Sequence, residues 1–364
     1  MQPQMKMPTK RQNGWKLTGI IALTLVLTTS CKVEFTPNST TQVDCPAVYC
    51  LLDQDDDTTY IRIQRNYLGE GNLYNYAAYY DSINYPQGSL DVKIIKWRAW
   101  RGSDRQLHKN EDREPTVLQF DYMLLNSKDS GSFNAPRQPV YVRRTAGELD
   151  TNCIYELVIL KNGDTLATSS TTLLSGNMQP IGVDKGYDFQ FLGAGRICTL
   201  RWNSLWGARR YQYTVRFHYR DFIRTWNATF SKYDTTTIPH YVDIEGPIVR
   251  ASTNSSEVKA SFPQSVFLHT IADAVKDDPY QKNVMDSIDI FVSACNEDFS
   301  AYLYSNENNG TINQDRQIYT NIEGGVGIFA SRRTNIHGTC KANISAQGAY
   351  MLALQELGVG FENR

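Results

Sequence analysis

Residues 211–220 read Tyr-Gln-Tyr-Thr-Val-Arg-Phe-His-Tyr-Arg, and this stretch decides the fold. Its odd-numbered positions are aromatic or β-branched, and its even-numbered positions are polar. Successive side chains of a β-strand point to opposite faces of a sheet, so this alternation predicts a strand with one buried and one wet face. Trp202 stands shortly before it. A tryptophan followed by such a strand is typical of immunoglobulin-like or fibronectin type III sandwiches, in which the tryptophan fills the core.

The chain before this strand carries further strand patterns and no convincing helix. In residues 60–65, Ile61 and Ile63 alternate with polar neighbours. Asn162-Gly163 between two β-rich runs is the strongest hairpin signal, because a type I′ turn needs positive φ at both central residues. The remaining strands that we expect here are residues 48–52, 90–100, 116–125, 139–143, 155–160 and 165–173.

The chain around and after residue 211 mixes strand and helix patterns. Phe267, Leu268, Ile271 and Val275 recur at helical spacing, and Pro279 follows them, so we predict a helix near 265–278. The other elements that we expect are strands at 187–192 and 197–202, a strand pair or one long strand over 288–304, and a short terminal helix within 347–357.

A polar stretch that contains glycine and proline, residues 176–186, separates the two groups of strands. We therefore predict a mainly β fold with two β-sandwich (immunoglobulin or fibronectin III-like) domains. The first covers residues 45–175, and the second covers residues 187–336 and contains the inserted helix. Residues 176–186 would be the linker, and residues 337–364 a C-terminal tail with a possible short helix.

The N-terminus has the pattern of an export signal. Four basic residues come first, residues 17–28 form an apolar run, and small residues lead directly into Cys31. The run matches a signal-peptide core and is too short to span a bilayer, which needs ~20 apolar residues. Small residues before a cysteine resemble a bacterial lipobox. We therefore predict a lipoprotein signal peptide over 1–30, lipid attachment (palmitate) at Cys31 and a polar tether over 31–44. Cleavage as an ordinary secretory peptide and an uncleaved anchor are the alternatives.

Charge and length narrow the classes of function. Residues 1–30 hold four basic residues and no acidic one, so without them the net charge falls from −1 to −5. A nucleic-acid partner requires a basic face, and this balance argues against one. The remaining 334 residues are enough for two domains of ~150 residues each.

Six cysteines follow Cys31, at positions 45, 50, 153, 198, 295 and 340. An even number in an exported chain is compatible with disulfides, and Cys45–Cys50 is the most local pairing. Buried free thiols are the alternative. The sequence has no C-x-x-C pair with a nearby histidine, so the spacing does not indicate a zinc site.

Several stretches in the same order resemble a family of uncharacterised outer-membrane lipoproteins of the Bacteroidota, described only by a domain of unknown function. They are residues 48–53, 60–71, 215–219 and 319–332. The resemblance covers most of the chain after Cys31. It implies an outer-membrane lipoprotein with β-sandwich domains, and it implies no activity. Residues 32–35 are only weakly acidic, so the periplasmic and the cell-surface side both remain open.

Three patterns suggest chemistry, and each has a better structural interpretation. The acidic run from Asp53 to Asp57 has Thr58 and Gln64 where an EF-hand needs Gly and Glu, so an exposed turn is expected. The glycine-rich residues 322–329 lack the Lys-Ser/Thr ending of a phosphate loop and favour a tightly packed strand. His108, His218, His240, His269 and His337 are scattered, no G-x-S-x-G motif accompanies them, and packed or solvated rings are expected. We predict no catalytic residue, no metal and no cofactor.

Tyrosines crowd one loop region, at Tyr74, Tyr76, Tyr79 and Tyr80, with Tyr85 close behind. Aromatic loops on a β scaffold can stack on sugars or grip a protein, although such a loop can also fold its rings onto its own sheet. We predict ligand binding at the first four of these tyrosines, in a non-enzymatic binding or accessory module of the cell envelope that engages a protein or a glycan. A membrane-tethered hydrolase and a structural subunit of an envelope assembly are the alternatives.

Overall fold

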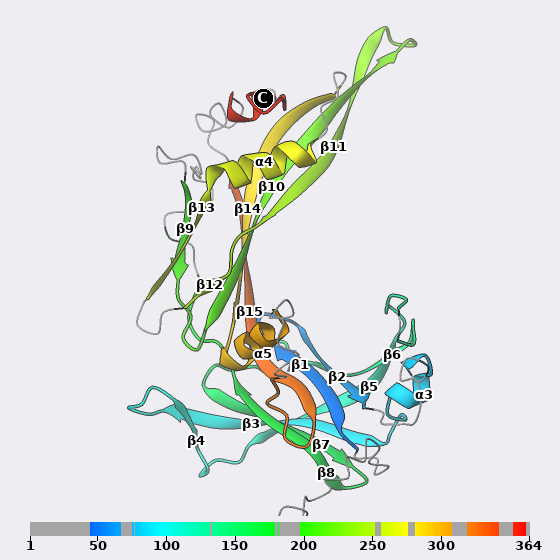
Figure 1. Ribbon diagram of the computed structural model, residues 1–364, viewed down its shortest axis with the longest axis vertical. Helices are drawn as coiled ribbons and strands as arrows, with labels where there is room; N and C mark the ends of the chain where they lie inside the picture. Colours follow the sequence, from blue (N-terminus) through cyan, green and yellow to red (C-terminus); the bar gives the residue numbers. More distant parts are fainter. Residues whose placement is uncertain are drawn as a thin grey trace, which may run out of the picture. The chain divides into compact units, whose positions relative to one another are not determined.

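The computed structural model describes residues 44–66, 75, 77–131, 133–178, 181, 197–251, 256–275, 281–307, 319–341 and 352–361 (Figure 1). The chain is mainly β. Its strands are β1 (Pro46–Leu52), β2 (Thr58–Arg65), β3 (Leu90–Arg101), β4 (Leu107–Lys109), β5 (Thr116–Leu125), β6 (Gln138–Arg144), β7 (Cys153–Lys161), β8 (Asp164–Thr172), β9 (Ile197–Asn203), β10 (Arg210–Asn227), β11 (Lys232–Glu245), β12 (Val249–Arg250), β13 (Glu257–Pro263), β14 (Gln281–Cys295) and β15 (Val326–Lys341). Its helices are α3 (Tyr80–Ile83), α4 (Gln264–Ala274) and α5 (Glu297–Glu307).

The described strands form one large mixed sheet and one small sheet. The large sheet has the order β11-β10-β14-β15-β1-β2-β6-β5-β3-β7-β8, with β12 beside β10 and β4 beside β3. The small sheet pairs β13 with β9. Among the described strands, β1 and β15 form a parallel pair and the other neighbours run antiparallel. Strand β11 therefore lies at one end of the large sheet and β8 at the other.

Strand β15 joins the two halves of the large sheet. Its first six residues pair with β1, and its later residues pair with β14. Gly327 has φ +112°, and a Cβ atom built on it would lie 2.0 Å from the Val48 carbonyl oxygen. Glycine is needed here because only a residue without a side chain allows the two backbones to approach so closely. The prediction of a tightly packed strand in the glycine-rich stretch is confirmed.

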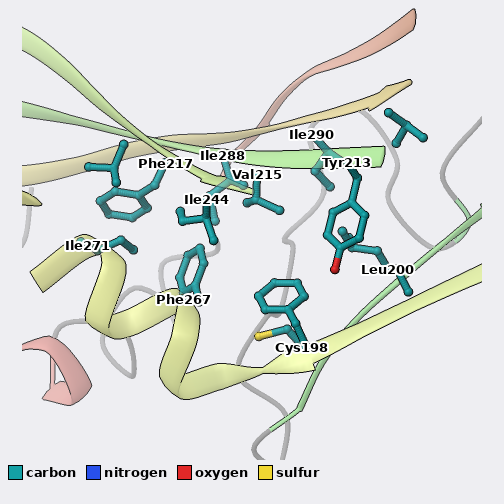
Figure 2. Close-up of a cluster of buried hydrophobic side chains, with 14 of the residues drawn as sticks. Cys198, Leu200, Tyr213, Val215, Phe217, Ile244, Phe267, Ile271, Ile288 and Ile290 are labelled. Atoms are coloured by element: carbon teal, nitrogen blue, oxygen red, sulfur yellow. The ribbon is translucent and has the colours of Figure 1, made fainter. Parts of the chain in front are cut away.

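Two clusters of buried apolar side chains form the core. One is built on β9, β10, β11, β13, β14 and α4, and Trp202 is almost fully buried in it. Figure 2 shows how Phe217 on β10 meets Phe267 and Ile271 on α4, with Cys198 on β9 nearby. The other cluster is built mainly on β1, β2, β3, β5 and β7, and it also takes in Ile322 and Phe329 from far along the chain.

The strand that was expected from its alternation is present and longer than expected. In β10 the inward side chains from Tyr211 to Tyr219 are buried, and those between them are half-buried or exposed, as the pattern predicts. The hairpin between β7 and β8 turns at Asn162 and Gly163, with φ 54° and 91°, which confirms the predicted turn. Residues 187–192 lie outside the described residues.

Helix α4 confirms the predicted helix near 265–278. It ends at Ala274, because the backbone of Val275 is extended. Residues 352–355 are helical, within the stretch where a short terminal helix was expected.

The expectation of strand over 288–304 is wrong in its second half, because β14 ends at Cys295 and α5 follows. Asn296 caps this helix: its side-chain oxygen accepts a hydrogen bond from the Phe299 N–H at 3.1 Å. An asparagine at a helix N-cap followed by two acidic residues was the signal that the sequence offered.

The local disulfide is also wrong. Cys45 and Cys50 are both thiols, and so are Cys153 and Cys295. In an antiparallel pair of strands Cys50 faces Ile61, with its side chain in the core. Burial raises the pKa of Cys50 and raises that of Cys295 to about 12, so these thiols stay protonated. The alternative of buried thiols is the better description.

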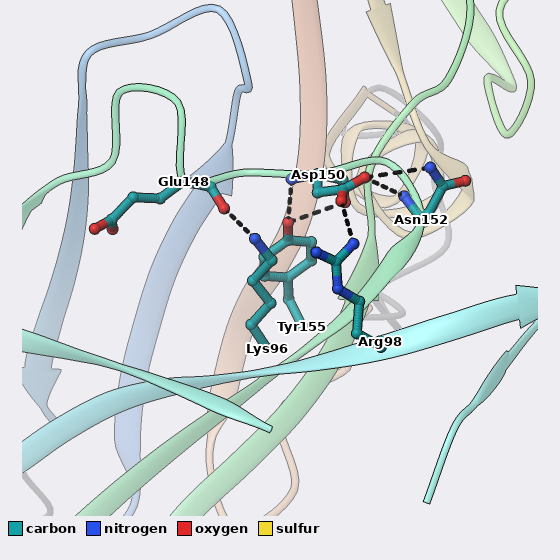
Figure 3. A network of polar contacts seen from close by, with 6 residues as sticks. All are labelled: Lys96, Arg98, Glu148, Asp150, Asn152 and Tyr155. Atoms are coloured by element: carbon teal, nitrogen blue, oxygen red, sulfur yellow. Dashed lines mark hydrogen bonds and ion pairs between the residues drawn. The ribbon is translucent and has the colours of Figure 1, made fainter. Parts of the chain in front are cut away.

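A polar network fixes the turn that leads into β7 (Figure 3). The Tyr155 hydroxyl donates to the Asp150 carbonyl at 3.0 Å and accepts from the Asp150 N–H at 2.6 Å. The Asp150 carboxylate in turn accepts from Arg98 at 2.8 Å, and Lys96 donates to the Glu148 carbonyl. A buried tyrosine that bonds the backbone five residues earlier holds the turn against the sheet.

Candidate interaction site

A long hairpin of β10 and β11 carries the most prominent exposed aromatic side chains of the described chain. The two strands pair without interruption from Thr214 with Glu245 to Asn227 with Lys232. The half nearer the body packs against α4 and the core, whereas every residue from 232 to 239 is exposed. Figure 1 shows this half of the hairpin continuing past α4. Because the core does not cover it, the distal half is available to a partner.

Three aromatic rings lie at the end of this hairpin, and we call them the aromatic tip. They are Trp226, Phe230 and Tyr233, exposed to 53%, 68% and 62%. Trp226 and Tyr233 are register partners whose ring centroids lie 5.0 Å apart, edge to face. Burying such rings in a partner is favourable, since aromatic side chains supply large apolar areas with few rotatable bonds.

The turn between β10 and β11, which carries Phe230 of the aromatic tip, is held in shape by Asn227. Its side-chain oxygen accepts from the N–H groups of Thr229 at 3.1 Å and Phe230 at 3.4 Å, and its amide donates to Asp234 at 2.5 Å. Ser231 completes the turn with φ 47°. These bonds fix the turn locally, so Phe230 is presented outward without the loss of entropy that a loose loop would suffer on binding.

Ion pairs brace the outer face of β10, β11 and β14, which is the face opposite to α4. Arg216 forms two hydrogen bonds with Asp243, at 2.7 and 2.8 Å, and its guanidinium lies over the Tyr241 ring at 4.1 Å. The Arg216 hydrogen bonds hold the pKa of Asp243 below its usual value. His218 pairs with Asp289 at 2.8 Å, and in the same row Arg220 pairs with Asp286 at 2.9 Å. Each pair joins two strands, so the base of the hairpin is rigid.

The tyrosine loop that the sequence singled out is described only in part. Tyr74 and Tyr76 lie outside the described residues. Tyr79 is exposed to 66%, whereas Tyr80 is half-buried, and its hydroxyl lies 3.0 Å from that of Tyr122. Burial and this hydrogen bond raise the pKa of Tyr80 to about 12. Binding at these tyrosines remains a prediction, and within the described residues only Tyr79 presents an open ring.

The acidic turn after β1 is occupied by arginines. Arg333 pairs with Asp55 at 2.7 Å, and Arg332 lies 3.4 Å from Asp56 and 3.8 Å from Asp53. Burial raises the pKa of Asp53, which accepts the Asp55 N–H. The expected exposed turn is confirmed for Asp55, Asp56 and Asp57, whereas Asp53 is buried. Among the described residues no group of three or more His, Cys, Asp or Glu side chains could hold a metal ion.

Three histidines pair with carboxylates. His108 lies 3.0 Å from Asp104, His218 pairs with Asp289 as above, and His240 lies 2.8 Å from Asp221. In each pair the ring nitrogen is Nε2, which in a Ser–His–Asp triad contacts the nucleophile. These contacts therefore hold strands and turns. His218 is half-buried, and not simply solvated as its place in the alternation suggested. The His269 side chain is exposed, and that of His337 lies outside the described ones.

The predicted signal peptide over 1–30, the lipidation site Cys31 and the tether up to residue 43 lie outside the described residues. The described chain begins at Asp44, whose carboxylate accepts from the Tyr85 hydroxyl at 2.7 Å and pairs with Lys161. These contacts fasten the end of the predicted tether to the sheet. Within the described parts of the chain, none of the helices is both long and apolar enough to cross a membrane.

No protein-family model matches the sequence, and no curated protein is significantly similar to it.

Proposed function

We propose that this chain is an outer-membrane lipoprotein, held to the membrane through Cys31, that acts as a non-enzymatic binding or accessory module of the cell envelope. The observation that supports the proposal is the aromatic tip: three exposed rings, one in a locally fixed turn and two on the strands beside it, at the end of a hairpin whose base is braced by ion pairs. Aromatic residues on a rigid support are typical anchors of protein interfaces.

A protein is the better partner for this tip than a glycan. A sugar ring stacks on an open, flat aromatic face, whereas Trp226 and Tyr233 stand at 65° to one another and share no common plane. Edge-to-face rings with an adjacent phenylalanine form an uneven apolar knob that suits a pocket in a protein. A glycan that stacks on the exposed Tyr79 would be the competing arrangement.

Two immunoglobulin-like sandwiches remain our proposal for the architecture. The small sheet of β9 and β13 contributes to the same core cluster as β10 and β14, with Trp202 between them. The Tyr155 hydroxyl that bonds the backbone of Asp150 resembles the tyrosine corner of such domains.

The test is affinity capture from detergent-solubilised envelope, with the full chain carrying a C-terminal tag. Trp226→Ala combined with Phe230→Ala should lose the partner that the parent chain recovers. Trp100→Ala and Tyr304→Ala remove rings of similar exposure elsewhere and serve as matched controls. Unchanged recovery with the double variant would refute the role of the tip.

The anchor is tested separately. Cys31→Ala should move the chain from the membrane to the soluble fraction, because acyl chains contribute about 0.8 kcal/mol per buried methylene. Continued membrane association of a Cys31→Ala chain from which residues 1–30 have been removed would contradict lipid attachment at this cysteine.

A further inference from the structure

Strand β11 presents a long edge that no other described strand covers. Among the described strands it hydrogen-bonds to β10 alone. Its 14 residues run in continuous register with β10, without a bulge. An edge of this length offers a row of backbone N–H and C=O groups that another strand can pair with.

The middle of this edge lacks the charges that usually prevent such pairing. Residues 235–239 read Thr-Thr-Thr-Ile-Pro, without a charged side chain, and all five are exposed. Four of them are β-branched, and β-branched residues favour strands. Soluble proteins commonly protect edges with lysine, inward charges, bulges or proline, and here only Pro239 is of that kind. Pro239 has no N–H, so it removes at most one donor from the edge.

From these features we propose that two copies of this chain pair edge to edge through β11, as an antiparallel two-fold dimer with its axis at Thr237. With that axis Thr237 faces itself, and Tyr233 faces Tyr241 of the second copy. Both tyrosines lie on the outer face and are exposed, to 62% and 58%. Opposed aromatic side chains stabilise antiparallel strands, so the two Tyr233–Tyr241 pairs of the dimer bury four rings that are otherwise exposed.

The charges agree with this register better than with its neighbours. With the axis at Thr237, Asp234 faces His240 of the second copy, whose ring also lies 2.8 Å from Asp221 of its own chain. An axis at Thr236 would place Lys232 opposite His240, so that two basic groups meet. An axis at Ile238 would place Tyr233 opposite Asp243, so the Tyr233–Tyr241 pair would be lost. Like charges that face one another destabilise a strand pair, which disfavours the axis at Thr236. A shift of the register by one residue would place outer-face side chains of one strand opposite inner-face side chains of the other, so such registers are excluded.

We therefore infer that the strand that pairs with β11 is β11 of a second copy. In a two-fold interface the same residues contribute to both sides, and the residues of β11 are complementary to one another in this way. The dimer uses the edge of the hairpin together with Tyr233, whereas the test of the proposed function uses Trp226 on β10 and Phe230 in the turn. The two can be separated: Trp226→Ala with Phe230→Ala should abolish partner capture and keep the dimer, and an edge variant should do the reverse.

Cross-linking through single introduced cysteines tests the register in the full chain, in intact cells. Thr237→Cys places two thiols across the axis, at a Cβ separation of about 5 Å. Thr235→Cys lies on the same strand and face, but the cysteine at position 235 of the second copy is four residues away along the edge. The two thiols are therefore about 14 Å apart. A short bis-methanethiosulfonate should give a dimer with Thr237→Cys and none with Thr235→Cys. The parent chain, with its native cysteines, gives the baseline.

Three outcomes would overturn the proposal. They are the absence of a dimer with Thr237→Cys, equal cross-linking at both positions, and an adduct whose mass shows a different protein beside Thr237. A second measurement uses sedimentation of the detergent-solubilised chain. Thr237→Lys, which sets two lysines against one another, should convert the dimer to monomer, and Thr229→Lys in the exposed turn should not. If both lysine variants behave like the parent, edge pairing is refuted.

Discussion

Replacing Gly327 with alanine should separate the two halves of the large sheet. The added Cβ would lie 2.0 Å from the Val48 carbonyl oxygen, and real Cβ contacts are not shorter than 3.0 Å, so one of the strands must move by about 1 Å. An L side chain at φ +112° costs about 1–3 kcal/mol in backbone strain. The displaced carbonyl and its neighbour would lose about two hydrogen bonds, at ~1 kcal/mol each.

The sum is a loss of about 3–5 kcal/mol of unfolding free energy, a large part of the 5–15 kcal/mol typical of a domain. We would measure it by urea denaturation followed by tryptophan fluorescence, together with hydrogen exchange of peptides from β1 and β15. Exchange should rise in both peptides, because they pair with one another.

Gly360→Ala is the matched control, since no atom lies within 4 Å of the position that its added Cβ would take. Its effect should stay within about 0.5 kcal/mol. If Gly327→Ala lost less than about 1 kcal/mol relative to this control, or if exchange in β1 were unchanged, the close approach of β15 to β1 would not be what joins the sheet.

Three further predictions concern the core, the ion pairs and the thiols. Trp202→Ala should lower the unfolding free energy by about 3–5 kcal/mol, because the ring is 1% exposed and packs on Tyr211 and Tyr213; the exposed Trp100→Ala should change little, and comparable thermal shifts for the two would contradict a core role for Trp202. The folded pKa of Asp243 is lowered by Arg216, so its stabilisation is present above the unfolded pKa and is lost as the pH falls through the folded pKa. Asp243→Asn should therefore flatten the loss of stability on acidification below about pH 4, measured by urea midpoints, and a curve parallel to that of the parent would argue against the pair. Alkylation without reductant, followed by mass spectrometry, should label the half-buried Cys45 first and the buried Cys50 and Cys295 only after unfolding; a Cys45–Cys50 disulfide in the native chain would refute the thiol assignment.

Sequence patterns were sufficient for elements that depend on nearby residues. The alternation in 211–220 predicts which side chains of β10 are buried, because the two faces of a strand follow from backbone geometry alone. Asn162-Gly163 predicts its turn for the same local reason. The sequence pattern does not predict helix α5, because its side chains lack a clear apolar stripe. The capping residue Asn296 is the local feature that indicates the start of this helix.

The candidate site could not be found in the same way. The residue types of the aromatic tip are those of buried strands: Trp226, Phe230 and Tyr233. The sequence around them does not indicate that their side chains are left uncovered. Their exposure follows from where α4 and the core end, relative to the length of the hairpin. The sequence points instead to the tyrosine loop, where the density of aromatic residues is the only signal.

The sequence by itself determined that this chain is mainly β, where its longest alternating strand lies, and that the glycine-rich stretch is a packed strand. Only the tertiary structure decided that β15 bridges β14 and β1, that Arg332 and Arg333 close the acidic turn far away in the chain, and that β11 is the last described strand at its end of the large sheet. The physical reason is range: periodicity and turn chemistry act over a few residues, whereas strand neighbours and ion pairs are selected by contacts between segments hundreds of residues apart.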